Sequence, residues 1–311
     1  MILIAAPAAL IALVSLAAFL GRWVWWLDVL ANFRAQYFVL LTVTGFVVVL
    51  SRWRNLGYGI LGVALVNLVF LLPLYLGSPG TADPAAPSIR VMSFNLLSSN
   101  QNFAGVIDYI DHVDPDLVFL HEASRPWEVA MESSALAYRV IRPRSDDMVF
   151  GTLVLMRQQE VEAVSHGFAA AQPRAVELSY RPRGWPDPIQ VLSTHPLAPT
   201  NAERASLRDA QIRFAAGWAQ GREGAVVVVG DLNATPWSWP FRLLTGTGLR
   251  NTQLGFGLQA SFPATAVFVL RVPIDHLLVS DELGVRERYL GPSLGSDHFP
   301  LVVDLELKPR S

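Results

Sequence analysis

The first 76 residues are dominated by three runs of apolar residues. Ile2–Leu20 and Leu56–Leu76 carry no charge and are long enough to cross a bilayer as helices. Tyr37–Leu50 is shorter, so it spans only with its flanking residues or forms a re-entrant or interfacial segment. The first run has no basic start and is followed by more apolar sequence, which argues against a cleaved signal peptide. We predict a membrane domain over residues 1–76 with about three transmembrane helices.

Charged and aromatic residues between these runs indicate an orientation. Arg52 and Arg54 lie in a short loop that the positive-inside rule places in the cytoplasm. With an odd number of spans, the C-terminal part of the chain then lies outside the cytoplasm. Three tryptophans, Trp23, Trp25 and Trp26, fit either an aromatic belt at the membrane interface or a packed core.

A segment rich in Pro and Gly, residues 77–87, follows the last apolar run. This composition predicts a stiff, extended linker with few contacts. A second domain is therefore expected over residues 88–311, and a fragment beginning at Ser88 is expected to fold without detergent.

Apolar patterning within the second domain predicts alternating strands and helices. The expected strands are Ile89–Leu96, Leu117–Leu120, Tyr138–Ile141, Val149–Met156, Val176–Tyr180, Ile189–Ser193 and Ala225–Val229. A helix is expected after Ser98, with Phe103, Val106 and Ile110 on one stripe, and it stops at Asp114-Pro115. Further helices are expected after Pro126 and from Asn201 to about Ala219.

Polar residues gather at the ends of these strands. After the buried run that closes at Val229, Gly230 lets the chain turn, and a carboxylate and a carboxamide emerge side by side. Two later strands, within Pro273–Val279 and Gly295–Val303, are expected to end in the same way with Asp-His pairs, and strand alternation turns His276 away from its neighbour. The polar residues at or just past strand ends are Asn95, Glu122, His195, Asp231, Asn233, Asp275, Asp297 and His298. Each alone reads as a turn, cap or loop residue, but together they predict one cleft.

Composition narrows the chemistry. The chain has no cysteine, which excludes disulfides and thiol catalysis, and its 52% hydrophobic content is concentrated in the N-terminal runs. Four of the 24 Lys and Arg and two of the 26 Asp and Glu precede residue 88, which leaves 20 basic and 24 acidic residues and a net charge of −4. A general nucleic-acid binder usually carries the opposite charge, so a DNA substrate is possible but not favoured.

The gathered polar residues suit a metal-dependent reaction. Glu122 and Asp297 are hard oxygen ligands in a set without cysteine, which favours Mg²⁺ or Mn²⁺ over zinc. A phosphate ester fits such a site. The metal would polarise a phosphoryl oxygen, and the proton of the attacking water would pass to Asp231 or to a His298 oriented by Asp275. His195 and Asn233 could then hold the developing charge.

These residues stand in motifs that resemble, in order, those of the endonuclease/exonuclease/phosphatase superfamily. That superfamily includes pancreatic-type deoxyribonucleases, abasic-site endonucleases, neutral sphingomyelinases and inositol-polyphosphate phosphatases. The matching segments, spread over about residues 89–306, are Phe94-Asn95, Leu120–Glu122, Ser193–His195, Gly230–Asn233, Ile274–Leu278 and Gly295–Pro300.

The resemblance implies an α/β (α+β) fold, a four-layer sandwich of two mainly antiparallel sheets flanked by helices, here preceded by transmembrane helices. It also implies roles for the site residues. Glu122 resembles the main metal ligand, completed by Asn95 and Asp297, and Asn95 also belongs to the phosphate site. The catalytic and substrate-binding roles fall to Asp231 as the water-activating carboxylate, Asn233 and His195 as phosphate contacts, and Asp275 as the partner of His298. Whether His298 or Asp231 is the base stays open.

The sequence therefore predicts a membrane-tethered phosphodiesterase or phosphatase that depends on Mg²⁺ or Mn²⁺. Its expected partners are the membrane and a phosphoester, either a lipid headgroup or a small phosphorylated compound. The expected location is the inner (plasma) membrane of a bacterium, with the catalytic domain extracytoplasmic. A nuclease is the first alternative, and a non-catalytic membrane scaffold with the same fold is the second. Trp237, Trp239 and Phe241 form either an apolar rim that touches lipid or a packed loop.

Overall fold

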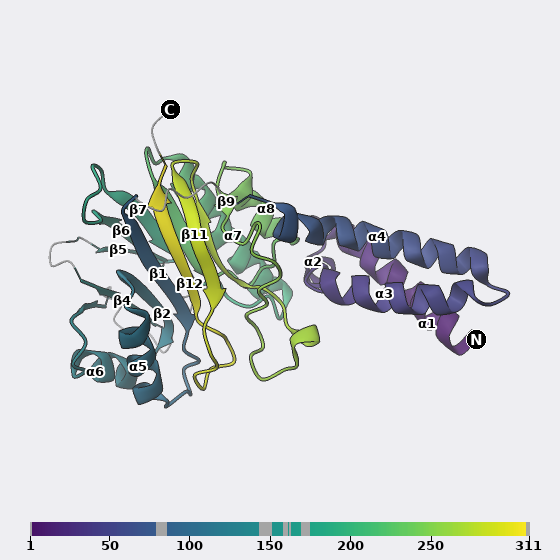
Figure 1. Ribbon diagram of the computed structural model, residues 1–311, viewed down its shortest axis with the longest axis horizontal. Coiled ribbons are helices and arrows are strands. Elements are labelled where there is room, and N and C mark those ends of the chain that lie inside the picture. Colours follow the sequence, from purple (N-terminus) through teal and green to yellow (C-terminus); the bar gives the residue numbers. More distant parts are fainter. Residues whose placement is uncertain are drawn as a thin grey trace.

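The computed structural model describes residues 2–78, 86–142, 151–157, 161, 163–168 and 175–308. An elongated bundle of helices is followed by a sandwich of two sheets (Figure 1). The Pro- and Gly-rich linker expected at 77–87 lies mostly outside the described residues, as do Val149 and Phe150 of one expected strand. The division into domains at these positions remains a prediction.

The bundle contains the apolar runs found in the sequence. Helix α1 (Ile2–Ala17) continues into the short 3-10 helix η1 (Ala18–Leu20), and α4 (Arg54–Leu76) runs alongside it. Within the described residues, these two stretches of 19 and 23 residues are long and apolar enough to cross a membrane. Helix α2 (Trp25–Ala31) meets α3 (Arg34–Val49) at a bend of 65°, and this bent pair makes a third span if it is taken as one. The expectation of about three spans sits at the upper end of this range.

Both the N-terminus and the loop between α3 and α4 lie at the end of the bundle that points away from the sheets (Figure 1). The loop contains Arg52, and Arg54 opens α4. The opposite end of the bundle carries α2 and meets the sandwich. Trp23 and Trp26 are exposed at this end, as a tryptophan belt at a membrane interface would be.

Two six-stranded sheets form the sandwich, and each contains a single parallel pair. In the first sheet the order is β11 (Leu283–Leu290), β12 (Leu301–Leu307), β1 (Ser88–Asn95), β2 (Leu117–Ala123), β4 (Gly151–Met156) and β3 (Arg139–Ile141). In the second it is β5 (Ala163–His166), β6 (Ala175–Tyr180), β7 (Ile189–Ser193), β8 (Val226–Asp231), β10 (Asp275–Val279) and β9 (Arg250–Asn251). The pairs β1–β2 and β7–β8 are parallel and the others antiparallel, which confirms two mainly antiparallel sheets.

Three layers of buried side chains confirm the four-layer architecture. Alternate strand residues such as Val91 and Val227 fill the space between the sheets. The outer face of the first sheet packs against α5 (Phe103–Val113) and α6 (Arg125–Glu132). The outer face of the second packs against α7 (Ala202–Gln220) and α8 (Trp239–Thr245).

The strand ends differ from expectation at two positions. Asp275 is the first residue of β10, and His298 precedes β12, whereas the sequence suggested that both follow strands. The prediction was wrong about which end of each strand these residues occupy, but right that they lie at a strand end. Because β10 is antiparallel to β8, its first residue lies opposite the last residue of β8, Asp231.

The loop after β8 packs against the helix bundle. Trp237 is buried beside Leu71 and Leu74 of α4, and its Nε1–H donates to the carbonyl of Phe70 (2.9 Å). Phe241 is buried in the layer beneath α7 and α8. The packed-loop alternative therefore holds for Trp237 and Phe241, and an apolar rim formed by them is wrong.

A buried ion pair fixes α2 to the sandwich. Asp28 of α2 is 2% exposed and Arg208 of α7 is 1% exposed, and their charged groups lie 3.0 Å apart. The second oxygen of Asp28 accepts the backbone N–H of Trp239 (2.6 Å). Thr235 donates to Asn32, just past the end of α2 (3.0 Å). The segment that follows β8 is thus held by the N-terminal part of the chain.

Candidate active site

The polar residues expected at strand ends converge at one end of the sandwich. Asn95 is the last residue of β1 and Asp231 the last of β8, so each sheet delivers one. His195 follows β7, which runs parallel to β8 and ends at the same edge. Asp275 stands opposite Asp231 in the β8–β10 register.

The carboxylate of Asp231 is the centre of the group. Its Oδ2 accepts Nδ2–H of Asn95 (3.1 Å) and lies 3.4 Å from Nε2 of His195 and 3.6 Å from Nε2 of His298. Its Oδ1 accepts the backbone N–H of Asn233 (3.0 Å). Burial alone would raise the pKa of Asp231, but the charge of His298 and the hydrogen bond with His195 outweigh it and hold the pKa well below its usual range.

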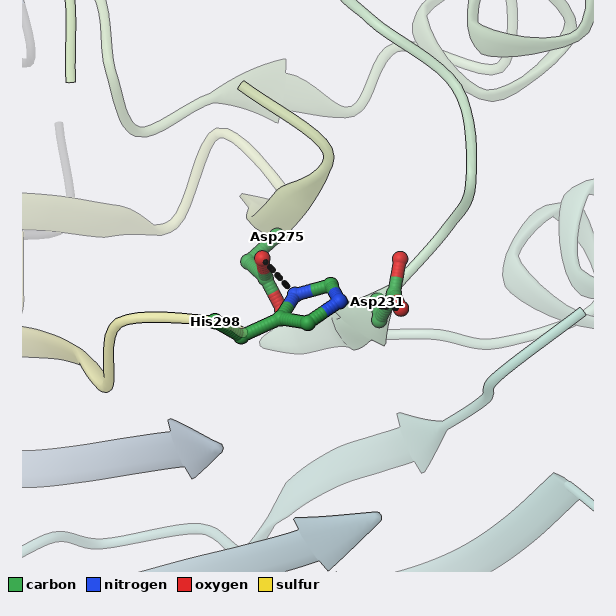
Figure 2. A group of neighbouring side chains, drawn as sticks. All are labelled: Asp231, Asp275 and His298. Carbon is green, nitrogen blue, oxygen red and sulfur yellow. Dashed lines mark hydrogen bonds and ion pairs between the residues drawn. The ribbon is translucent and has the colours of Figure 1, made fainter. Parts of the chain in front are cut away.

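His298 lies between two aspartates. Figure 2 shows its ring with one nitrogen toward Asp275 and the other toward Asp231. Its Nδ1–H donates to Oδ2 of Asp275 (2.8 Å). Burial lowers the pKa of His298, but the negative charges of Asp275 and Asp231 outweigh burial and raise the pKa to about 10. The imidazole is therefore charged at neutral pH and holds a proton on the side facing Asp231.

His195 carries the second imidazole of the site. It is buried, which lowers its pKa, but the hydrogen bond with Asp231 and the charges of Asp231 and Glu122 raise it overall. Its Nε2 lies 3.9 Å from Oε1 of Glu122, so this nitrogen faces both carboxylates. Two imidazoles whose pKa values are raised thus flank the Asp231 carboxylate.

Glu122 comes from a distorted part of β2. Its backbone has φ of 55°, in the left-handed region, where the pairing of β2 with β4 is interrupted by a bulge. Its carboxylate accepts N–H groups from the Asn95 side chain (3.1 Å) and the Ser98 backbone (3.2 Å). A strained backbone that aims a carboxylate into a cluster is typical of functional sites.

Asn233 also has a left-handed backbone, with φ of 48°. Its Nδ2–H donates to the carbonyl of Pro196 (3.0 Å), and its own carbonyl accepts from Arg208 (3.3 Å). These contacts tie the loop after β8 to the loop that holds His195. The contact of Asn233 with phosphate stays a prediction.

Asp297 is placed next to the group but is less integrated than the other residues. Its side chain is half-buried and lies 3.5 Å from Oγ of Ser296, while its carbonyl accepts the N–H of Ala264 (2.6 Å). It adds negative charge near His298. Its part in a metal site likewise stays a prediction.

His276 faces the opposite side of β10, as strand alternation predicts. It is fully buried against Phe241, and its Nε2–H donates to the carbonyl of Ala234 (2.9 Å). Burial, with the charge of Arg288, lowers its pKa to about 3, so this imidazole is neutral. It supports the loop after β8 and takes no part in the cluster.

Sequence reasoning missed several supporting residues. Ser261 accepts the backbone N–H of Asp275 (3.2 Å), and Ser296 donates to the carbonyl of Asn95 (2.7 Å) while accepting the N–H of His298 (3.0 Å). The ring of Phe262 stacks on His298 with centroids 4.8 Å apart. Ser296 stands inside a recognised motif, but Ser261 and Phe262 carried no signal because their partners are remote in the sequence.

Two sets of residues could hold a metal ion. Among the described residues, Asp231, Asp275 and His298 have ligand atoms within 4.8 Å of one another. In that set, however, Nδ1–H of His298 donates a hydrogen bond to Oδ2 of Asp275, so these two atoms are not free to bind an ion. The set expected from the sequence, Glu122 with Asn95 and Asp297, leaves that pair intact. For Asn95 to bind the ion together with Glu122, its amide must rotate. Its Nδ2 now faces Glu122, while its Oδ1 accepts the N–H of Leu97.

Residues 92–298 match the sequence pattern of the Endonuclease/Exonuclease/phosphatase family. No curated protein sequence matches. Among solved structures, humanised TDP2 of D. rerio is similar with a TM-score of 0.59 and 17% identity, covering 70% of this chain and 99% of that one.

The catalytic domain of human nocturnin gives a TM-score of 0.54 and 20% identity, with 72% and 96% covered. A family protein of Bacteroides vulgatus gives 0.57 and 16%, with 71% and 100% covered. Identities this low show the shared fold alone. The match to the family pattern covers about two thirds of the chain, however, and it contains all eight of the polar residues expected at the site. The chain therefore belongs to the Endonuclease/Exonuclease/phosphatase family, whose members are generally phosphoester hydrolases that use divalent metals.

Proposed function

We propose that this protein is a divalent-metal-dependent phosphoester hydrolase anchored in a membrane by its N-terminal helices. The observation that supports this most is the Asp231 carboxylate of the second sheet. Asn95 and His298 from the side of the first sheet, and His195 from the second, converge on it within 3.6 Å. This carboxylate can accept a hydrogen bond from water, while the two imidazoles can contact a phosphate. The N-terminal anchor rests on two helices of sufficient length and apolarity.

The residues fit a metal of the Mg²⁺ or Mn²⁺ type. Glu122 accepts hydrogen bonds from the neutral N–H groups of Asn95 and Ser98, and Nε2 of His195 lies 3.9 Å from its Oε1. Carboxylate and amide oxygens are the ligands such ions prefer. We assign the ion to Glu122, Asn95 and Asp297. When bound there, it would polarise a phosphoryl oxygen and stabilise charge on the phosphorus centre.

The protein groups then divide the remaining work. Asp231 is unprotonated and is placed to accept a hydrogen bond from water. Because the charge of His298 lowers its pKa, it takes up the proton of the water only as the bond to phosphorus forms. Asp275 holds the ring of His298 through Nδ1 and so keeps Nε2 directed at the carboxylate of Asp231. His195 offers an N–H to a developing oxyanion, and Asn233 fixes the loop that carries these groups.

For the substrate we favour a phosphoester at the membrane surface, either a lipid headgroup or a small phosphorylated compound. The net charge of −4 on residues 88–311 repels long polyanions. A nuclease is the second candidate, because a similar structure, TDP2 of D. rerio, was determined in complex with a single-stranded DNA product. A non-catalytic scaffold is disfavoured because all eight polar residues are present.

The metal assignment predicts that removal of one carboxylate abolishes both binding and turnover. Glu122→Gln in the full-length protein should lose tight Mn²⁺ binding, followed by electron paramagnetic resonance, and most hydrolysis of 4-nitrophenyl methyl phosphate. Chelation of the wild type should stop hydrolysis, and Mg²⁺ should restore it. Glu287→Gln, at a side chain 57% exposed, is the matched control and should change neither.

The same assay decides between the two ligand sets. Asp275→Asn should keep Mn²⁺ bound while lowering turnover, since Asp275 then acts only through His298. Loss of Mn²⁺ in Asp275→Asn with retention in Glu122→Gln would move the ion to the Asp231, Asp275 and His298 group. Full activity in excess chelator would reject a metal-dependent reaction. Product release from phospholipid vesicles and from single-stranded DNA, at equal phosphate concentration, separates the two substrate classes.

A further inference from the structure

Four consecutive apolar side chains stand exposed on the sandwich. Val267, Phe268, Val269 and Leu270, which we call the apolar tip, are 64%, 55%, 61% and 59% exposed. The last three form the 3-10 helix η2 (Phe268–Leu270). In the described part of residues 86–308, the other large apolar side chains that are exposed, Val129 and Val164, are isolated in the sequence. A contiguous apolar patch of this kind marks an interaction surface.

The apolar tip lies beside the helix bundle. Gln36, in the first turn of α3, donates from Nε2 to the carbonyl of Arg271 at the base of the tip (2.9 Å). Figure 1 shows the small helix η2 next to the end of the bundle that meets the sheets. The exposed Trp23 lies in the short segment that precedes α2 at the same end. The tip thus lies against α3 at the end of the bundle that meets the sandwich.

The base of the tip is built into the active site. Phe262 and Val272 exchange two backbone hydrogen bonds (3.1 and 2.6 Å), which closes the segment between them into a loop. The Phe262 ring stacks on His298, and the N–H of Ala264 donates to the carbonyl of Asp297. A loop closed and held at its base keeps a fixed position relative to these residues.

Arg271 stiffens the loop from within. Its guanidinium donates to the carbonyls of Ala266 (2.8 Å) and Ala264 (3.4 Å) and lies over the ring of Phe299, 4.6 Å from its centroid. Four residues lie between Phe262 and Val267. An extended chain covers at most about 3.3–3.6 Å per residue, so the Cα atom of Val267 lies within roughly 18 Å of that of Phe262, whose ring packs on His298.

We propose that the apolar tip inserts into the bilayer in which the N-terminal helices are embedded, and that it brings the active site onto phosphoesters carried by lipids in that bilayer. The inference rests on the proposed function and narrows its substrate class to membrane-embedded phosphoesters. A bilayer is the occupant because the tip carries four apolar side chains and lies against α3 of the helix bundle. Acyl chains bury such side chains at any orientation, without specific polar partners.

Insertion can be measured directly because the chain contains no cysteine. Val269→Cys in the full-length protein, labelled with an environment-sensitive NBD dye, is reconstituted into vesicles of phosphatidylcholine and phosphatidylglycerol. We expect blue-shifted emission and quenching by nitroxides placed on the acyl chains. Val129→Cys is the matched control, since Val129 is 49% exposed on α6, on the side of the sandwich away from the bundle, and its label should report water.

The substrate class is tested with two esters that share one leaving group. Phe268→Ser combined with Leu270→Ser should lower kcat/KM for 4-nitrophenyl hexadecyl phosphate in these vesicles by roughly tenfold or more. The reason is that two apolar side chains that the acyl chains would bury are lost. Hydrolysis of water-soluble 4-nitrophenyl methyl phosphate should stay within about twofold, because neither residue touches the reacting groups.

The outcomes separate this inference from the proposed function. A Val269 label as accessible to water as the Val129 label would overturn the inference and leave the surface to a protein partner. Equal losses on the two esters would also overturn it, since the tip would then only support the fold of the site. Absence of hydrolysis of either ester by the wild type would reject the proposed function, while the label would still decide whether the tip inserts.

Discussion

Asp231 joins the two sheets through a single oxygen atom. Its Oδ2 receives Asn95 from β1 and faces the imidazoles of His195 and His298, so three side chains depend on one carboxylate. The sequence contains two Asp-His pairs, Asp275-His276 and Asp297-His298. Of their two histidines, only His298 faces the Asp231 carboxylate. His276 sits behind it, neutral and buried.

This difference between the two histidines gives a test with one type of substitution. His298→Gln should lower kcat on 4-nitrophenyl methyl phosphate by about a hundredfold or more, as should Asp231→Asn, because groups that move protons contribute at this level. His276→Gln keeps a side-chain N–H for the carbonyl of Ala234 and should cost much less. Circular dichroism establishes that each variant is folded. Equal losses at the two histidines would assign the wrong one to catalysis.

At this scale the sequence predicts which residues gather but not how they are bonded. All eight polar residues could be named because they stand in short motifs beside strands. The orientation of the Asn95 amide, the support from Ser261 and the stacking of Phe262 depend on residues brought together only by the fold. No local pattern of apolar and polar positions contains such contacts.

The β8 strand positions the Asp231 carboxylate with the help of a glycine, Gly230. Gly230 has φ of 144°, which L side chains rarely adopt, and a Cβ added there would overlap the carbonyl oxygen of Thr194. The close approach of β7 and β8 brings His195 to Asp231. An apparently ordinary turn glycine is therefore a packing requirement of the site.

Gly230→Ala should destabilise the sandwich by about 2 kcal/mol or more, because the methyl group must displace backbone. It should also reduce activity by shifting Asp231. Gly217→Ala on α7, where an added Cβ meets nothing within 4 Å, is the control and should stabilise by about 0.5–1 kcal/mol as a helical alanine. Denaturant unfolding measures both. Similar free energies of unfolding for the two variants would show that the strands can separate without cost.

Among the secondary-structure elements, those with strong patterns were predicted, whereas of the four edge strands only β3 was. Three strands absent from the prediction, β5, β9 and β11, are all edge strands of their sheets. Edge strands pair on one side only and are short or carry charges, as Arg286, Glu287 and Arg288 do in β11. Their sequences therefore lack the continuous apolar runs that identified β8 and β2.

The whole molecule is held together by an ion pair between parts far apart in the chain. Asp28 and Arg208 are both buried where α2 meets α7, and Arg208 also donates to the carbonyl of Asn233. The helix bundle thus contacts the loop that follows Asp231. The contact has no signature in the sequence, because packing between segments far apart in the chain leaves no periodic pattern. A fragment from Ser88, expected to fold without detergent, would leave Arg208 and Trp237 without these partners.

Asp28→Asn should destabilise the full-length protein by about 3–5 kcal/mol, because it leaves the buried Arg208 without its main counter-charge. Asp281→Asn removes an aspartate from a pair with Arg250 whose carboxylate side chain is 83% exposed, and it should cost less than about 1 kcal/mol. Thermal unfolding of both in the same detergent gives the comparison. Matching shifts in Tm would mean that water replaces Asp28 around Arg208.

The arrangement of the bundle also limits where this protein can work. The N-terminus and the loop between α3 and α4 both lie at the end of the bundle away from the sheets, so both sheets lie at the opposite end. A protein inserted in this way reaches one leaflet only. If the protein hydrolyses lipids as proposed, turnover in sealed vesicles would stop once that leaflet is consumed and resume at the rate of transverse lipid exchange. In a living membrane, the supply of substrate would then depend on whichever process moves lipids across the bilayer.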